Sequence, residues 1–182
     1  HCFSADSSTM SELTLYSVAT NAILLQTREC ERIRDVLKQR GIGFERWPAH
    51  HQLDCDASVA QILETYKREI EWTQERGNFP SVDAIRVQPD QPDRVALRQK
   101  FLKEHVHAED EVRFFVEGCG LFCLHIGDEV VQVLCETNDW ISVPAGTRHW
   151  FDMGAKPCFC TLRFFNNPSG WVAEFTGDTI AD

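Results

Sequence analysis

Three histidines and one glutamate are the side chains of this sequence best suited to hold a metal ion. His105, His107 and Glu111 are all odd-numbered residues of one β-like segment. Because side chains alternate between the two faces of a strand, these three can point to the same side. Proline and glycine in the segment 144–147 form a tight turn that leads directly to a further histidine. Imidazoles and a carboxylate converging in one place are typical of a transition-metal site. The sequence therefore predicts one ion bound by His105, His107, Glu111 and His149.

This donor set favours a catalytic ion over a structural zinc ion. Structural zinc sites are usually tetrahedral, closed and rich in thiolates. Three imidazoles and one carboxylate suit a six-coordinate ion such as Fe(II), Ni(II), Mn(II) or Co(II), and leave two positions open for a bidentate substrate or oxygen. One carboxylate on a dication leaves a net charge of about +1, which favours anionic chelators. Arg113 shares the odd parity and adds a permanent positive charge beside the ion.

The remaining histidines and the cysteines are interpreted as structural residues. A single histidine on a β face usually belongs to the core or the surface, and we expect this of His50, His51 and His125. The chain has eight cysteines but no C-x-x-C motif, which argues against a thiolate zinc site. Four cysteines lie in β-like runs and are expected to behave as small apolar residues: Cys123, Cys135, Cys158 and Cys160.

The elements that must position the metal site are short strands. Residues 105–176 alternate between β-rich runs and turn residues, including a run at 111–117, a glycine turn at 118–120, a run at 121–126 and a hairpin turn at Gly127-Asp128. This spacing is typical of an all-β sandwich or barrel such as the cupin jelly roll, in which strands distant in sequence become neighbours. We therefore predict a mainly-β barrel over residues 101–176, with a few helices outside it.

The first hundred residues contain most of the predicted helices. Two short strands are expected at 13–18 and 22–25, then a helix with Thr27 as its N-cap that ends at Gly41. A second helix begins at Ser58, which forms a capping box with Gln61, and continues to residue 77. A third helix follows Pro92-Asp93 and ends near residue 102. We interpret residues 1–9 as an upstream segment and residues 10–182 as a single cupin domain.

Charge and hydropathy exclude several classes of partner. The formal net charge of −10 repels phosphate backbones, so a nucleic-acid partner is not expected. No run approaches the roughly 20 apolar residues that a membrane span needs, and residues 1–10 do not have the pattern of a signal peptide. We expect a cytoplasmic protein, with a monomer as the default because no heptad pattern demands a partner.

Two segments resemble the two cupin motifs. His105-Val106-His107, Glu111 and Gly118 follow the spacing of the first motif, and the segment from Pro144 to His149 follows P-x-G-x-x-H of the second. The sequence departs from the motifs at three positions. Gln99 and Asn138 replace glycines that usually precede the two motifs, and Met153 stands where an asparagine often closes the second. Asparagine tolerates the left-handed turn conformation, so the fold is not threatened at Asn138.

Longer runs resemble the acireductone dioxygenase family. They include HAEDEVRFFVEG from residue 107, LFCLHIGD from residue 121 and ISVPAGTRHWFDMG from residue 141, and the resemblance extends from about residue 10 to the end of the chain. It implies cleavage of acireductone (1,2-dihydroxy-3-keto-5-methylthiopentene) by O2 in methionine salvage. With Fe(II) the expected products are 4-methylthio-2-oxobutanoate and formate, and with Ni(II) they are 3-methylthiopropanoate, formate and carbon monoxide.

The resemblance also assigns roles to single residues. By motif position it places one ion per chain, Fe(II) or Ni(II), on the four predicted ligands. It associates Arg113 with forming and holding the substrate dianion. It links Glu104 to metal incorporation and Asp110 to the relay of local conformational change. It implies that Phe101 and Phe151 line the substrate pocket.

Two alternatives stay open on the bare ligand set. Another cupin metalloenzyme, such as a manganese-dependent oxidase or a sugar isomerase, has a compatible site. The run EVRFFVEG from residue 111 argues against it, and turnover of acireductone against oxalate separates the two. A non-enzymatic, metal-stabilised binding module is the second alternative, and it predicts a coordination sphere that is filled by protein groups alone.

Overall fold

The computed structural model describes residues 11–48, 51–167 and 173–181. Its helices are α1 (Cys30–Lys38), α2 (Val59–Thr65), α3 (Lys67–Arg76) and α4 (Arg94–Leu102). Its strands are β1 (Glu12–Ser17), β2 (Ile23–Thr27), β3 (Gly43–Arg46), β4 (Ser81–Val87), β5 (His105–Val106), β6 (Glu111–Ile126), β7 (Glu129–Glu136), β8 (Asp139–Val143), β9 (Arg148–Asp152), β10 (Phe159–Phe165) and β11 (Glu174–Phe175).

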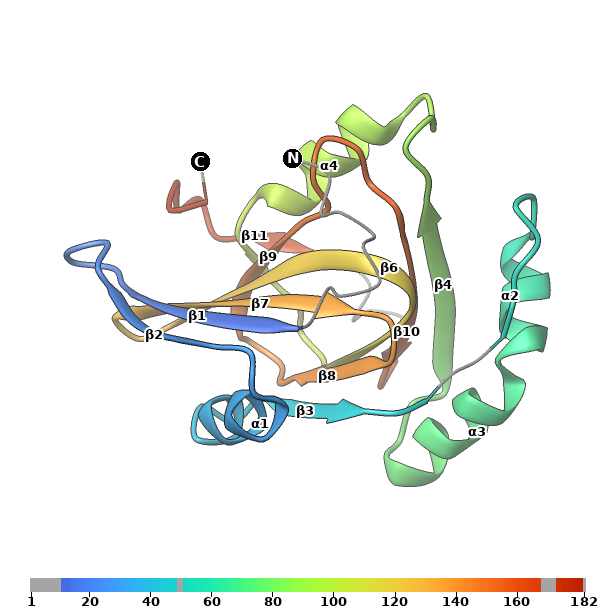
Figure 1. Ribbon diagram of the computed structural model, residues 1–182, viewed down its shortest axis with the longest axis horizontal. Coiled ribbons are helices and arrows are strands. Elements are labelled where there is room, and N and C mark those ends of the chain that lie inside the picture. Colours follow the sequence, from blue (N-terminus) through green and yellow to red (C-terminus); the bar gives the residue numbers. More distant parts are fainter. Residues whose placement is uncertain (1–10, 49–50, 168–172, 182) are drawn as a thin grey trace.

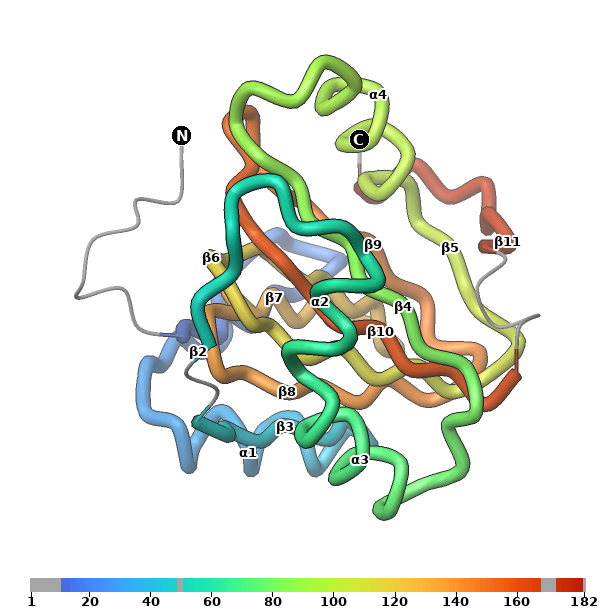
Figure 2. Tube along the Cα trace, turned by 90° about the vertical axis from the view of Figure 1, so that its right-hand side faces the viewer, coloured from blue at the N-terminus to red at the C-terminus, as the bar shows by residue number. Residues whose placement is uncertain are grey.

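The strands form two layers that share one long strand. The order β11-β5-β9-β6-β7-β1-β2 makes one layer, and β4, β10, β6, β8 and β3 make the other. The helices lie outside these layers: α1 packs against β3, α2 against β4 and α4 against β9 (Figure 1). Figure 2 shows α2 and α3 together on one side of the molecule. The prediction of a mainly-β fold with flanking helices is confirmed, although β1 to β4 extend the sheet beyond the stretch 101–176.

β6 is one continuous strand, so the turn predicted at residues 118–120 is wrong. Its first half pairs with β8 and β10, and its second half pairs with β7 and β9. The strand passes from one layer to the other through a register irregularity opposite Cys160 and through Gly118, which has a φ of 62°. Glycine is therefore used here to bend a strand rather than to end it.

We expect Gly118→Ala to be one of the most destabilising single changes outside the metal site. A Cβ atom at Gly118 would lie 1.8 Å from the backbone oxygen of Cys158, and the left-handed backbone adds strain. The free energy of unfolding should fall by at least about 3 kcal/mol. Gly127→Ala is the matched control, because Gly127 also has a positive φ but its Cβ would meet no atom within 4 Å. Denaturant unfolding should show a loss of about 1 kcal/mol there, and equal losses in the two variants would contradict the steric argument.

Two local predictions in the first hundred residues need correction. Thr27 is not the N-cap of α1: it is the last residue of β2, and α1 begins after Glu29. The helix predicted from Ser58 to residue 77 is two helices, because Tyr66 leaves the helical conformation between α2 and α3. The capping box of Ser58 and Gln61 is confirmed.

β4 is the strand that the sequence does not predict. Its run SVDAIRV interrupts apolar residues with Asp83 and Arg86, which obscures the alternation expected of a half-buried strand. In the fold Asp83 pairs with Arg163, and Arg86 pairs with Glu117. The charges are therefore matched by partners on β10 and β6, which the sequence of β4 alone does not reveal.

Asp139 gives the stability of the protein a pH dependence that is separate from the metal site. Its carboxylate is fully buried, accepts hydrogen bonds from Ser11 and from the backbone of Glu136, and lies 3.1 Å from Arg46 Nε. Burial outweighs these partners and raises the pKa of Asp139 to about 6, above its ordinary value of 3.8. The folded state therefore favours the protonated carboxyl, and this contribution is complete below about pH 4 and is lost as the pH rises through 6.

Asp139→Asn should remove this dependence. The difference in unfolding free energy between wild type and variant should change by about 2 kcal/mol between pH 4 and pH 7, with wild type losing stability relative to the variant at the higher pH. Urea unfolding of both proteins across this range measures it. A constant difference would mean that Asp139 is ionised throughout.

Other expectations from the sequence concern whole-chain properties. In the part of the chain that the structure describes, no helix combines the length and the apolar content that crossing a membrane requires. Residues 1–9 lie outside the described ranges, and the single-domain assignment stays a prediction.

Candidate metal centre

The four predicted ligands converge between the two layers of strands. His105 of β5 is directly opposite His149 of β9, and Glu111 is the first residue of β6. The chain between them is not a strand: residues 107–110 form a loop that leads from one layer to the other. His105, His107 and Glu111 nevertheless lie close together, because the loop brings Glu111 back to the side of the two histidines where β6 begins.

The distances are those of a ligand cluster. One nitrogen from each of His105, His107 and His149 lies within 4.8 Å of the others. Glu111 Oε2 lies 3.0 Å from His107 Nε2 and 3.8 Å from His149 Nε2. All four side chains are buried. The three imidazoles are therefore close enough to share one divalent ion, and the Glu111 carboxylate lies beside two of them.

Backbone carbonyls fix which ring nitrogen faces the centre. The Nδ1 atom of His105 donates to the Lys103 carbonyl oxygen at 2.7 Å, and that of His149 donates to Thr147 at 2.8 Å. The protons are thereby assigned to Nδ1, and the lone pairs belong to Nε2. His149 Nε2 is buried and has no hydrogen-bond partner among the described residues. A buried imidazole nitrogen with an unused lone pair is what a metal ligand requires, so these residues fit a bound ion.

The ionisation states also fit a metal. Burial lowers the pKa of His149 to about 3 and lowers the pKa of His105, so both rings are neutral at pH 7. Burial by itself would raise the pKa of Glu111, but the Arg113 guanidinium, together with His107 and His149, holds it well below its usual range. Neutral imidazoles and an ionised carboxylate are the forms in which these groups bind metals.

Arg113 is a buried cation beside the cluster. Its Nε atom donates to Glu111 Oε1, whereas Oε2 is the oxygen nearest His107 and His149. Its guanidinium lies over the rings of Phe122 and Phe151, 5.3 and 5.4 Å from their centroids. The sequence-based expectation that Arg113 faces the ligands is consistent with this geometry, and the stacking holds its positive charge in an apolar surrounding.

Aromatic rings surround the centre. Phe101 and Phe151, the two predicted pocket residues, lie 6.5 Å apart in an edge-to-face arrangement. Phe122, which the sequence does not single out, stacks on His149 at 5.5 Å and an interplanar angle of 11°. Phe122 reaches His149 because β6 pairs with β9. The sequence of β6 alone does not show which residues of β9 lie opposite it. Two further rings, Phe165 and Phe175, flank His107 and His105.

Glu104 and Asp110 do not join the ligands. Asp110 is exposed, and its carboxylate accepts a hydrogen bond of 2.8 Å from the backbone of Ala145. Gly146 donates to the carbonyl oxygen of His107 at 3.0 Å, so the loop after β5 is tied to the turn that precedes His149. Glu104 is buried on the opposite side of β5 from His105, where it contacts His125.

The remaining histidines and cysteines are outside the cluster. His51 pairs with Glu69 at 2.8 Å, and His50 lies outside the described residues. No disulfide is found among the described cysteines. Burial of Cys123, Cys135 and Cys160 is confirmed, whereas Cys158 is exposed just before β10 and does not act as a core residue.

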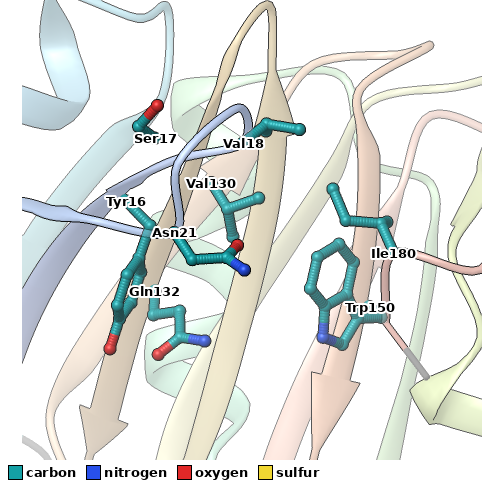
Figure 3. Close-up of a pocket in the computed structure, with 8 residues that line it drawn as sticks. All are labelled: Tyr16, Ser17, Val18, Asn21, Val130, Gln132, Trp150 and Ile180. Atoms are coloured by element: carbon teal, nitrogen blue, oxygen red, sulfur yellow. The ribbon is translucent and has the colours of Figure 1, made fainter.

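A separate pocket of about 260 Å³ lies on the outer face of the sheet. Tyr16, Asn21 and Gln132 lie on one side of it, and Trp150 with Ile180 lies on the other side (Figure 3). Trp150 follows His149 in β9, and neighbouring residues of a strand point to opposite faces. The pocket is therefore behind the ligand cluster and does not belong to it.

A family model and relatives of high sequence identity match nearly the whole chain. Residues 14–173 match the family model described as the ARD/ARD′ family. The chain is 62% identical over 173 residues to an acireductone dioxygenase of Synechococcus sp. (strain WH7803), covering 95% of this chain and 96% of that one. It is 61% identical over 179 residues to one of Prochlorococcus marinus (strain MIT 9313), covering 95% and 97%.

A solved structure is similar over nearly the whole chain. It is an acireductone dioxygenase from Bacillus anthracis with a cadmium ion in its active centre, and it matches with a TM-score of 0.78 at 28% identity. The match covers 93% of this chain and 100% of that one. This likeness confirms the predicted cupin fold.

Proposed function

Since the chain belongs to the acireductone dioxygenase (ARD/ARD′) family of enzymes, we propose that it binds one divalent ion through His105, His107, Glu111 and His149 and cleaves acireductone with O2. The observation that carries the proposal is the buried His149 Nε2, whose lone pair has no hydrogen-bond partner among the described residues and faces Glu111. The cadmium ion of the Bacillus anthracis relative supports a metal in the same fold.

A bound divalent ion would supply Lewis acidity and a template for a bidentate substrate. The rest of the site belongs to the chain. Arg113 provides the positive charge that favours the deprotonated, anionic form of an enediol substrate. Because Phe122 and Phe151 pack against its guanidinium, this charge acts in a surrounding of low polarity, where it is worth more than in water.

The surrounding rings exclude water from the reacting groups. Phe151 is buried and contacts Phe101, and Phe122 covers one face of His149. We assign Phe101 and Phe151 to the wall that receives the apolar methylthio chain of the substrate. Glu104 and Asp110 contact neither the side of the ligands that faces the proposed ion nor the rings of Phe101 and Phe151. We therefore assign both residues to positioning the loop and the strand ends, and not to contact with substrate.

The identity of the metal decides the products in this proposal. With Fe(II) we expect 4-methylthio-2-oxobutanoate and formate, as methionine salvage requires, and with Ni(II) we expect 3-methylthiopropanoate, formate and carbon monoxide. Both ions accept imidazole and carboxylate ligands, so one site can hold either. The cytoplasmic location, the monomeric state and the absence of a nucleic-acid partner stay predictions.

Oxygen uptake with two substrates tests the proposed reaction against the alternative of another cupin metalloenzyme. Metal-loaded protein should consume O2 with acireductone and leave oxalate unchanged, and chelator-treated protein should do neither. Turnover of oxalate in place of acireductone would favour the manganese-type oxidase. Metal binding without turnover of either substrate would favour the binding module.

A further inference from the structure

A buried polar pair lies directly behind the proposed ligand His105. Glu104 precedes this ligand in the chain and is 2% exposed on the outer side of the sheet, where His125 of β6 is 7% exposed. His125 Nδ1 donates to Glu104 Oε2 at 2.7 Å. The other carboxylate oxygen, Oε1, accepts a bond of 2.7 Å from the hydroxyl of Thr176. Both oxygens of Glu104 are thus engaged by residues from distant parts of the chain.

The same pair fixes the C-terminal segment to the outer face. The backbone of Thr176 donates to the carbonyl oxygen of Glu104 at 3.2 Å, and Phe175 of β11 pairs with His105 of β5. Farther along, Ile180 packs against Trp150, as Figure 3 shows at the edge of the outer pocket. The segment after β11 therefore covers the back of the two strands that carry proposed ligands.

We infer that His125 is a positioning residue for the metal centre. It holds Glu104, Glu104 holds Thr176, and together they fix the backbone of residues 103–105. This backbone orients the ligand, because His105 Nδ1 donates to the carbonyl oxygen of Lys103. Groups that orient a ligand from behind typically change metal affinity by about 10- to 100-fold when they are removed. The inference rests on the proposed function of His105 as a ligand.

The same residues do not make a good second metal site. Ligand atoms of Glu104, His125 and Asp178 lie within 4.8 Å of one another. However, the carboxylate of Glu104 already accepts two hydrogen bonds, and Asp178 is exposed and accepts a bond from the backbone of Ile180. We therefore expect one ion per chain, with His125 acting through hydrogen bonds.

Four variants test this inference. His125→Leu removes the donor to Glu104, whereas His125→Asn keeps an N–H group near the position of Nδ1. Thr176→Val removes the second donor with little change of shape. Tyr66→Phe is the control, because it removes one hydrogen bond of a fully buried side chain, to the His51 carbonyl oxygen, in the separate cluster under α2 and α3.

The measurement is the rate at which Ni(II)-loaded protein loses its ion to excess EDTA, with metal content and thermal unfolding recorded for each variant. His125→Leu should lose Ni(II) at least about 10-fold faster than wild type, and Thr176→Val should lie between the two. His125→Asn should stay within about 3-fold of wild type, and Tyr66→Phe should match wild type even where its melting temperature falls.

Each outcome decides a different point. Ni(II) loss from His125→Leu at the wild-type rate would overturn the inference, and so would equal acceleration in His125→Leu and Tyr66→Phe. A second Ni(II) ion in wild type that is missing in His125→Leu would make His125 a ligand instead. Failure of wild type to bind any ion would instead contradict the proposed function.

Discussion

Replacing His149 with alanine is expected to abolish tight binding of a divalent ion while the chain still folds. The change removes one of four proposed donor atoms. The loss of metal affinity should therefore exceed roughly 100-fold, which is the upper limit typical of removing a group that only orients a ligand. Folding should survive because the ring packs among Phe122 and two other imidazoles, and its Nε2 atom makes no hydrogen bond to a described residue. Oxygen uptake with acireductone should fall to the level of chelator-treated protein.

Metal titration by calorimetry and metal analysis of the purified protein measure this loss. His51→Ala is the matched control, because His51 also pairs with a carboxylate, Glu69, but lies outside the cluster. The control should bind one ion with wild-type affinity. Retention of one tightly bound ion by His149→Ala would remove His149 from the ligand set.

Replacing Arg113 with alanine should have the opposite pattern, with the metal kept and turnover lost. The four ligands remain, but the charge that favours the substrate dianion disappears from a buried position. Loss of one preorganised electrostatic group of this kind costs about 100- to 1,000-fold in kcat. Arg113→Lys should recover part of the rate, because it restores the charge without the planar stacking on Phe122 and Phe151.

Steady-state oxygen uptake with the metal content of each sample measured beforehand separates the two effects. Arg86→Ala serves as the control, since Arg86 of β4 also pairs with a glutamate of β6, but with Glu117 and not with the proposed ligand Glu111. It should leave kcat near wild type. Wild-type turnover in Arg113→Ala would exclude Arg113 from the reaction, and loss of metal in that variant would mean that Arg113 mainly stabilises Glu111.

The convergence of the proposed ligands could be expected from the sequence only in part, because the alternation of side chains holds within a strand and residues 107–110 form a loop. His105, His107, Glu111 and Arg113 were expected on one face, and they meet in the fold even though a loop separates β5 from β6. Asn138 likewise adopts the positive φ, 82°, that its place in the second motif predicts. Both features are set by a few neighbouring residues.

The features that the sequence does not predict depend on contacts between distant strands. The stacking of Phe122 on His149 requires the register of β6 against β9. The burial of Glu104 requires the C-terminal segment, since Thr176 is 72 residues away. The glycine at 118 was interpreted as a turn because a single chain shows the glycine but not the Cys158 carbonyl that approaches it.

We propose that one buried ion on these four ligands gives the chain its acireductone dioxygenase activity. The most direct test is anaerobic reconstitution of the metal-free protein with Fe(II) or with Ni(II), followed by acireductone and O2 and identification of the products. We expect 4-methylthio-2-oxobutanoate and formate with Fe(II), and carbon monoxide with 3-methylthiopropanoate and formate with Ni(II). One bound ion per chain without oxygen uptake in either sample would contradict it.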